Sequence, residues 1–261
     1  GDNIANVNST AHKSSRLEYS ENFVETLERS SAAPGNGNQP LGSARLQLGG
    51  GVQIDAVSQD FSQGAIKTTG FATDLALEGR GFFHVKEVDT AGGATGNEFY
   101  TRAGNFRLDQ TGFLVTTDGF RVQQIGGADI NLAYTANDGR TLEAVDIDLN
   151  GQVRLMLSDG TIDTTRGIIQ VSDFRDSQGL VKQGKGYFEN DSNDSAGLIT
   201  EFNQAGLGGL GKVRARSLEQ SNVDLTEQFA EMITTQRSFQ AGARIITTAD
   251  QLLTEAVNLK R

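Results

Sequence analysis

The sequence predicts an α+β protein in which a β-rich central body precedes one long C-terminal helix. Glycine reaches 32 residues while proline occurs twice and tryptophan not at all, which is typical of short strands joined by glycine turns. Through the middle of the chain apolar and polar residues alternate with the period of a β-strand. After Asn222 the apolar spacing changes to alternating steps of four and three residues, the period of a helical seam.

These changes of pattern predict three parts. The first, residues 1–44, is an N-terminal helix end followed by an extended linker; the second, residues 45–215, is the β-rich body; the third, residues 216–261, is a coiled-coil-type helix. The chain opens at Gly1 rather than at a methionine, and we expect further residues upstream of it.

Composition and charge exclude several classes of protein. The 261 residues include no cysteine, so disulfides, thiolate nucleophiles and cysteine-based metal sites are excluded. The 33 acidic and 23 basic residues give a net charge of −10, so nucleic acid and anionic lipid are not expected partners. No apolar run approaches the roughly 20 residues that a membrane-spanning helix needs, so we expect no membrane insertion.

The N-terminal part combines two patterns. Nearly helical spacing, compatible with a helix, relates Glu18, Phe23, Val24 and Leu27. Residues 30–38 then consist of Ser, Ala, Pro, Gly and Asn alone, a composition that predicts an extended loop.

Short strands are predicted through the β-rich body because of its alternating pattern. The predicted strands cover residues 52–57, 74–77, 82–85, 99–101, 106–108 and 114–116. The clearest hairpin joins residues 145–149 to residues 152–157 through Asn150 and Gly151. Since an Asn-Gly pair accepts positive φ at both positions, we expect a two-residue turn there.

The last segment predicts a helix over residues 224–259, about 54 Å long at 1.5 Å per residue. Asp224, with Glu227 three residues later, is typical of a capped helix start. The apolar seam of this helix comprises Leu225, Phe229, Met232, Phe239, Ala243, Ile246, Leu253 and Val257. A seam of this length needs a partner helix; the alternative is that it packs on the β-rich body.

Nothing in the sequence predicts an enzyme, a cofactor or a metal site. The two histidines are His12, in the polar opening segment, and His84, which we expect on the solvent side of its strand. Residues 206–211 match the dinucleotide pattern G-x-G-x-x-G, but residues 212–216 after them predict a strand where that motif requires a helix. Residues 146–157 open like a calcium loop and end in Leu rather than in the required Glu.

Both ends of the chain carry recognisable motifs. Near the start are Asn3, Ile4, Ala5, Asn6 and Asn8. This pattern resembles the N-terminal signature N-I-A-N-V-N-T-x-G-[FY]-K of the bacterial flagellar rod and hook proteins. The chain departs from it at Ala11 and His12, where the family has a glycine and an aromatic residue. Near the other end, residues 218–225 resemble the hook protein and carry the motif residues Ser221, Asn222 and Asp224. Residues 60–66 and 100–106 resemble central β motifs of the family.

The resemblance implies an architecture and partners. Family members carry terminal helices that form a coiled-coil-like inner layer of a hollow axial filament, with the β-rich body as the next layer outward. The partner of the seam would then be an N-terminal helix that ends near Val7 and lies largely outside this chain. The implied partners are other copies of the chain, in a helical homopolymer, and neighbouring axial proteins of the rod, hook cap and hook–filament junction. Type III export and no cofactor are also implied.

Within the family, the motifs at residues 219–224 and 258–261 favour the extracellular hook, a universal joint that transmits motor torque to the filament. The alternative is the distal rod, the drive shaft of the basal body in the periplasm. About 40 residues between Gln124 and Thr165 are too few for the extra outer domain of many hook proteins, and residues 19–52 resemble the extended segment that stiffens the distal rod. A remote alternative is a secreted β-rich binding module or hydrolase, which would stay monomeric with its C-terminal helix ordered.

Overall fold

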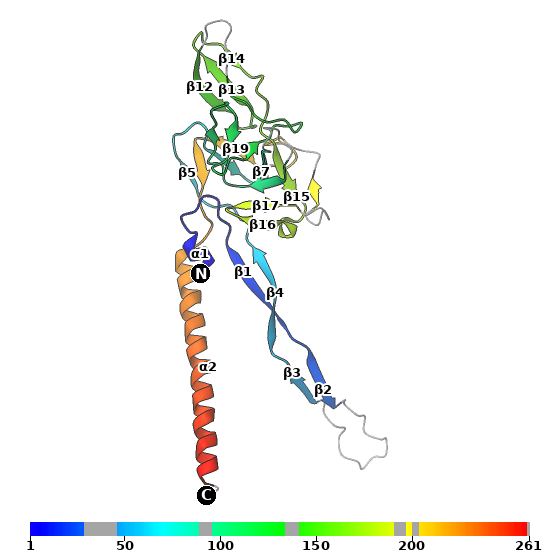
Figure 1. Cartoon of the computed structure of the whole chain (residues 1–261), viewed down its shortest axis with the longest axis vertical. Helices are drawn as coiled ribbons and strands as arrows, with labels where there is room; N and C mark the ends of the chain where they lie inside the picture. The colour runs from blue at the N-terminus through cyan, green and yellow to red at the C-terminus, as the bar shows by residue number, and fades with distance from the viewer. Residues whose placement is uncertain (29–45, 89–95, 134–140, 191–196, 200–203, 260–261) are drawn as a thin grey trace. The chain divides into compact units, whose positions relative to one another are not determined.

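The described part of the chain divides into two compact units. The computed structural model describes residues 1–28, 46–88, 96–133, 141–190, 197–199 and 204–259, so the loop predicted over residues 30–38 lies outside the described residues. The smaller unit is Ser15–Asp60, and the larger one joins Gly1–Ser14 to Phe61–Arg261. Figure 1 shows all described elements.

The smaller unit is built from two antiparallel strand pairs. β1 (Ser15–Glu21) pairs with β4 (Val52–Gln59), and β2 (Val24–Glu28) pairs with β3 (Leu46–Gly49) (Figure 1). The backbone N–H and C=O groups of each strand are therefore hydrogen-bonded to the strand that it pairs with.

The helix-compatible spacing predicted in this region is wrong. Glu18 lies in β1, Val24 and Leu27 lie in β2, and Phe23 lies between these strands. The stronger pattern is the alternation of Leu17 and Tyr19 with polar neighbours, which gives β1 one apolar face. In this segment the alternation of apolar and polar residues, with a period of two, determines a strand, although the spacing of four other residues is compatible with a helix.

The larger unit is β-rich and ends in one long helix, which confirms the predicted α+β class. Its elements in chain order are α1 (Asp2–Ala5), β5 (Ile66–Thr68), β6 (Leu75–Glu78), β7 (Phe82–Lys86), β8 (Glu98–Thr101), β9 (Arg107–Leu108), β10 (Leu114–Val115), β11 (Arg121–Val122), β12 (Leu142–Ile147), β13 (Val153–Leu157), β14 (Ile162–Asp163), β15 (Val171–Phe174), η1 (Ser177–Gly179), β16 (Val181–Gly184), β17 (Tyr187–Glu189), β18 (Leu198–Ile199), β19 (Lys212–Ala215), β20 (Ser217–Glu219) and α2 (Leu225–Leu259).

The main sheet has nine strands. Its path runs β16-β17-β8-β7-β11-β10-β9, and β15 pairs with both β7 and β18. Three ladders are separate from this sheet. One is formed by β12, β13 and β14; in the others β19 pairs with β6, and β20 pairs with β5. The last two ladders pair strands near the C-terminal helix with β6 and β5, so these two strands hold the chain segment that leads into α2.

Strand β7 is the centre of the core. It pairs with β8 on one edge and with β11 and β15 on the other, and apolar clusters cover both of its faces. Phe83 and Val85 lie in the larger cluster, whereas Phe82 packs edge-to-face on Phe174. The first four residues of β7 are therefore buried, and only Lys86 at its end is half-buried.

His84 is therefore buried, and the expectation that it faces solvent is wrong. Its ring stacks on Tyr100 with centroids 5.1 Å apart, and its Nε2 lies 3.3 Å from an oxygen of Glu98. Burial lowers the pKa of His84, and the Glu98 carboxylate opposes that shift. The side chain is therefore a core residue of the sheet.

The predicted hairpin of β12 and β13 is confirmed, but its turn is not the expected two-residue type. The Asp148 N–H donates to Gln152 O (3.0 Å) and the Gly151 N–H donates back to Asp148 O (2.8 Å), so three residues form the loop. Within this loop Gly151 alone has positive φ. The Asp148 carboxylate accepts the Leu149 N–H (2.8 Å), which favours a turn that starts at Asp148.

Arg216, between β19 and β20, provides a test of backbone strain. It is exposed, its φ is +57°, and its carbonyl accepts the Thr69 N–H (2.8 Å). Because a left-handed backbone is costly for any residue except glycine, Arg216→Gly is expected to raise the free energy of unfolding by up to about 1 kcal/mol. Urea denaturation measures it. The matched control is Arg214→Gly in β19, where glycine is expected to lower stability by about 0.5–1 kcal/mol; equal losses in both variants would contradict the strain.

Tyr187 provides a test at alkaline pH. Burial raises the pKa of its phenol to about 12. Between pH 10 and 12 the unfolded chain loses this proton while the folded chain keeps it, so the folded state is expected to lose at most about 2.7 kcal/mol over that window. Tyr187→Phe removes this loss, which urea midpoints at pH 8 and pH 11 measure. Tyr19→Phe, at an exposed tyrosine, is the control; the same pH dependence in both variants would contradict the assignment.

Candidate functional site

Three segments that are far apart in sequence meet directly before α2. These segments, residues 11–14, 62–66 and 217–224, are here called the junction. The Ala11 N–H donates to Glu219 O (2.9 Å), and the Asn222 N–H donates to His12 O (3.3 Å). On the other side, β20 pairs with β5, and the Gln220 N–H donates to Ala65 O (2.8 Å). The segment that enters α2 therefore lies between the other two and is hydrogen-bonded to both.

A buried carboxylate, that of Glu219, lies at the centre of the junction. One of its oxygens accepts hydrogen bonds from Lys13 Nζ (2.7 Å) and from the Gly64 N–H (2.9 Å). Its other oxygen lies 3.5 Å from Arg102 Nη1. The side chains of Glu219, Lys13 and Arg102 are 0%, 1% and 5% exposed. Since isolated buried charges are costly, the pairing of this carboxylate with both cations keeps the junction closed.

Other groups complete this charged centre. Lys13 Nζ also donates to Ser62 O (2.7 Å), so one ammonium group connects all three segments. The Arg102 guanidinium lies 5.4 Å from the ring centroid of Phe82, which links the junction to the aromatic core. Burial lowers the pKa of Arg102, while the Glu219 charge opposes that shift. A Cβ at Gly64 would overlap the Gln220 carbonyl, so a glycine is required where these two segments cross.

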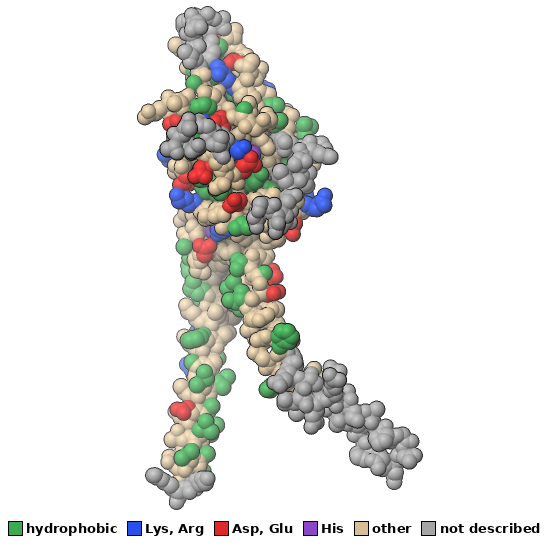
Figure 2. Space-filling model, turned by 45° about the vertical axis from the view of Figure 1, so that its right-hand side comes forward, with side chains coloured by type: hydrophobic (Ala, Val, Ile, Leu, Met, Phe, Trp, Pro, Cys, Tyr) green, Lys and Arg blue, Asp and Glu red, His purple; other side chains and the backbone are tan. Residues whose placement is uncertain are grey.

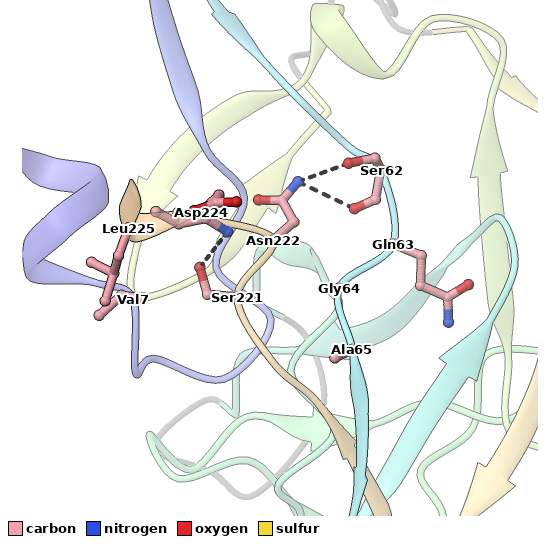
Figure 3. Close-up of a pocket in the computed structure, with 10 residues that line it drawn as sticks. Val7, Ser62, Gln63, Gly64, Ala65, Ser221, Asn222, Asp224 and Leu225 are labelled. Carbon is pink, nitrogen blue, oxygen red and sulfur yellow. Dashed lines mark hydrogen bonds between the residues drawn. The ribbon is translucent and has the colours of Figure 1, made fainter. Parts of the chain in front are cut away.

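Asn222 joins the same segments with its side chain. Its Oδ1 accepts the Ser14 N–H (2.8 Å), and its Nδ2 donates to the carbonyl oxygen (3.3 Å) and to Oγ (3.1 Å) of Ser62. Figure 3 shows this amide directed toward Ser62. An amide provides a donor and an acceptor at once, which is what a position between two backbones requires.

Ser221 and Asp224 shape the start of α2. The Val223 N–H donates to Ser221 Oγ (3.2 Å) (Figure 3). Asp224 Oδ1 accepts the N–H groups of Thr226 (2.7 Å) and Glu227 (3.4 Å), which confirms the predicted cap. The helix then runs over Leu225–Leu259, within one residue of the prediction.

The N-terminal motif residues lie in α1 and the turn after it. Asn3 is buried, and its Nδ2 donates to Gln228 Oε1 on α2 (3.0 Å). Asn6 Nδ2 donates to Asp2 O (3.0 Å) and Oδ1 (2.8 Å), which closes α1. Ile4 is half-buried in α1, whereas Ala5 and Asn8 are exposed. The structure therefore brings Asn3 to α2 and leaves Ala5 and Asn8 at the surface.

A cleft of about 500 Å³ opens at the junction. It is lined by Val7, residues 62–65 and residues 221–225, so the first seam residue, Leu225, borders it together with Val7. The carboxylate of Asp224 in this lining is already used as a helix cap. The rest of the lining consists of small, apolar and amide side chains.

The predicted seam residues lie along α2 without cover. No residue of α2 is buried, and Phe239, Ile246 and Leu253 are 79%, 71% and 66% exposed. Met232 is half-buried, and the same side of the helix carries Leu225, Phe229, Ala243 and Val257. Figure 2 shows hydrophobic side chains along the length of this helix. The alternative that the seam packs on the β-rich body is wrong for the isolated chain.

Sequence reasoning did not identify the buried ion cluster. Glu219 and Lys13 are 206 positions apart, and no spacing rule relates them. The available signal was a charged residue within the short strand pattern Ser217-Leu218-Glu219. Two further findings concern other kinds of site: no described helix is long and apolar enough to span a membrane, and the described residues contain no group of three His, Cys, Asp or Glu placed to hold a metal.

Comparisons with known proteins match both ends and the body. Residues 214–259 match the family profile "Flagellar basal body rod FlgEFG protein C-terminal", and residues 76–155 match "Flagellar hook protein FlgE/F/G D1 domain". The chain is 38% identical to the flagellar basal-body rod protein FlgG of Bacillus subtilis over 100% of this chain and 92% of that protein. It is 31% identical to FlgG of Agrobacterium fabrum over 96% of this chain and 88% of that protein. To the flagellar hook protein FlgE of Borreliella burgdorferi it is 46% identical, over 46% of this chain and 26% of that protein.

Proposed function

Because the chain belongs to the FlgE/F/G family of bacterial flagellar rod and hook proteins, we propose that it is a subunit of the distal rod, the drive shaft of the flagellar basal body. The proposal rests on how much of the chain aligns with rod relatives and how much with the hook relative. The rod relatives align over 96–100% of the chain, whereas the hook relative aligns over 46% of it. The hook, which the terminal motifs favour, is the alternative with less support.

The ribbon formed by β1 and β4 supports a stiff assembly. Directly opposite residues in an antiparallel pair share a face, and Leu17 lies opposite Val57 while Tyr19 lies opposite Ile54. The ladder skips Asp55, and this bulge brings Ile54 and Val57 to the same side although they are three residues apart. The resulting face is mostly apolar: Leu17, Tyr19, Val52, Ile54 and Val57 on it are 49–72% exposed, and Glu21 lies at its end, opposite Val52.

A two-stranded ribbon is only marginally stable by itself, and an uncovered apolar face of this kind needs a partner. We propose that neighbouring copies cover this face in the rod. Contacts made by this ribbon would add a second connection between subunits to that made by the inner helices and would therefore oppose bending. A drive shaft needs this property, whereas a universal joint does not.

The exposed seam of α2 is the proposed inner contact of the assembly. Helical polymerisation uses a heterologous interface that does not close, so each copy must present apolar surface that stays uncovered in the isolated chain. The junction holds the start of α2 to the β-rich body and would transmit torque between the two layers. In this proposal the chain lies in the periplasm after type III export, next to other axial proteins.

Deletion of the gene from its host, followed by electron microscopy of purified basal bodies, tests the proposal. The expected result is a shortened rod without a hook, restored by the unmodified gene supplied in trans. A complete rod that lacks only the hook would instead identify a hook subunit. Intact flagella would overturn both assignments within the family.

A further inference from the structure

The junction contains one of the two histidines of the chain, His12. Each of the four residues 11–14 makes a hydrogen bond to the segment that enters α2. The His12 carbonyl provides one of these bonds, since it accepts the Asn222 N–H (3.3 Å). Of the four side chains, that of His12 is the one whose ordinary pKa lies near neutral pH. A change in its charge therefore acts where the two segments are joined.

The imidazole of His12 is buried without a partner for one of its nitrogens. The residue is 9% exposed, and its Nε2 is buried with no hydrogen-bond partner in the described part of the chain. A neutral ring carries one N–H, whereas a protonated ring carries an N–H on both nitrogens. Protonation therefore places a charged donor where the folded chain provides no acceptor, which is costly.

The charged groups near the ring do not remove this cost. Burial lowers the pKa of His12, and the Lys182 charge on β16 lowers it further, while Asp2 on α1 opposes the shift. The side chain of Asp2 is 60% exposed and lies 3.6 Å from Lys182 Nζ, so its carboxylate is shared with another cation. In the segment that enters α2, Glu219 pairs with two buried cations and Asp224 caps the helix.

We propose that His12 makes the junction sensitive to acid, and that its protonation releases residues 11–14 from the segment that enters α2. The charged ring gains water when it moves outward, and this movement breaks the hydrogen bonds of the residues attached to it. Ala11 favours the release, because its φ of +53° is strained in the closed junction. Since β20 stays paired with β5, the start of α2 is loosened rather than detached.

The proton balance fixes the direction of this response. Below about pH 6.5 the released chain binds a proton at His12 that the closed junction binds less readily, so the opening equilibrium rises as the pH falls. The rise is at most about tenfold for each pH unit between the two pKa values, and it stops below the lower one. This inference goes beyond the proposed function and holds for a rod subunit and for a hook subunit alike.

Amide hydrogen exchange of the full chain, followed by NMR at pH 7.5 and pH 5.0, tests the proposal. After correction for intrinsic exchange rates, the protection of the Ala11 and Asn222 amides is expected to fall about threefold or more at pH 5.0. The Gln220 amide donates to Ala65 O on the other side of the same segment and is the internal control. It should keep its protection; an equal fall at all three amides, or no fall at any of them, would overturn the proposal.

Two variants assign the response to one histidine. His12→Phe introduces an aromatic residue, as the family has here, and should remove the pH dependence at Ala11 and Asn222. His84→Gln replaces the other histidine, which is also buried, and should leave that dependence unchanged. A fall that persists in His12→Phe, or that disappears in His84→Gln, would contradict the proposal. An NMR titration of the His12 ring requires no substitution, and a pKa of 6.5 or above in the folded chain would overturn the proposal as well.

Discussion

Replacement of Glu219 by glutamine is expected to lower the free energy of unfolding by about 3–5 kcal/mol. The substitution keeps the size of the side chain and removes its charge. Lys13 and Arg102, whose side chains are 1% and 5% exposed, then remain as buried cations without their carboxylate. Urea denaturation of the purified chain, followed by circular dichroism, measures the shift of the midpoint.

Two further variants make this test specific. Arg154→Gln removes an ion pair with Asp148 whose side chains are 40% and 30% exposed, and its cost is expected to stay below about 1 kcal/mol. Lys13→Met combined with Glu219→Gln removes one cation together with the anion and should recover part of the loss. If Glu219→Gln costs no more than Arg154→Gln, the cluster does not hold the junction together.

The fold was predictable where one period dominates a segment. The end points of α2 follow from a four-three repeat that begins directly after a capping aspartate, Asp224. The hairpin of β12 and β13 follows from alternation on both sides of Asn150-Gly151. Its turn was mispredicted because Asp148 provides a competing local hydrogen bond, and such a bond depends on side-chain placement rather than on residue type alone.

Burial was less predictable than secondary structure. His84 was expected on the solvent side of its strand, but β7 is covered on both faces, and the covering residues come from distant strands. The junction was not predicted for the same reason: Lys13 contacts Glu219, which lies in β20, and β20 is placed by its pairing with the distant strand β5. Contacts of this kind follow from topology, which local patterns do not encode.

Ala11 shows what the family resemblance adds. The family has a glycine at this position, and here Ala11 has φ of +53°, in the left-handed region that glycine adopts without strain. The Ala11 N–H donates to Glu219 O, so this backbone conformation is part of the junction. The departure from the family sequence therefore keeps the geometry and adds local strain.

The terminal motifs could not distinguish rod from hook for a physical reason. Asn3, Ser221, Asn222 and Asp224 position α1, α2 and the junction, which join the inner helix to the body. Such contacts serve any axial subunit built on this plan. The proposal of a distal rod rests instead on the ribbon of β1 and β4 and on the extent of alignment with rod relatives.

A charge placed in the seam is expected to abolish assembly without unfolding the chain. Ile246 is 71% exposed in the isolated chain, so Ile246→Glu should change the free energy of unfolding by less than about 0.5 kcal/mol. In an assembled seam the same carboxylate would be buried without a partner, at a cost of about 4 kcal/mol or more per contact, a thousandfold loss in association. Phe229→Glu, in the first half of α2, should behave in the same way.

The control for Ile246→Glu is Thr247→Glu, which introduces the same charge one residue further along the helix, on its polar side. Rods in purified basal bodies are counted for each variant, and urea midpoints of the purified chains establish that both are folded. Because the two variants have the same net charge, a loss of rods confined to Ile246→Glu can only come from the face that carries the charge. Normal rods from Ile246→Glu and Phe229→Glu would mean that the exposed seam is not an assembly surface, and the stiffness of the polymer would then have to come from the β-rich units alone.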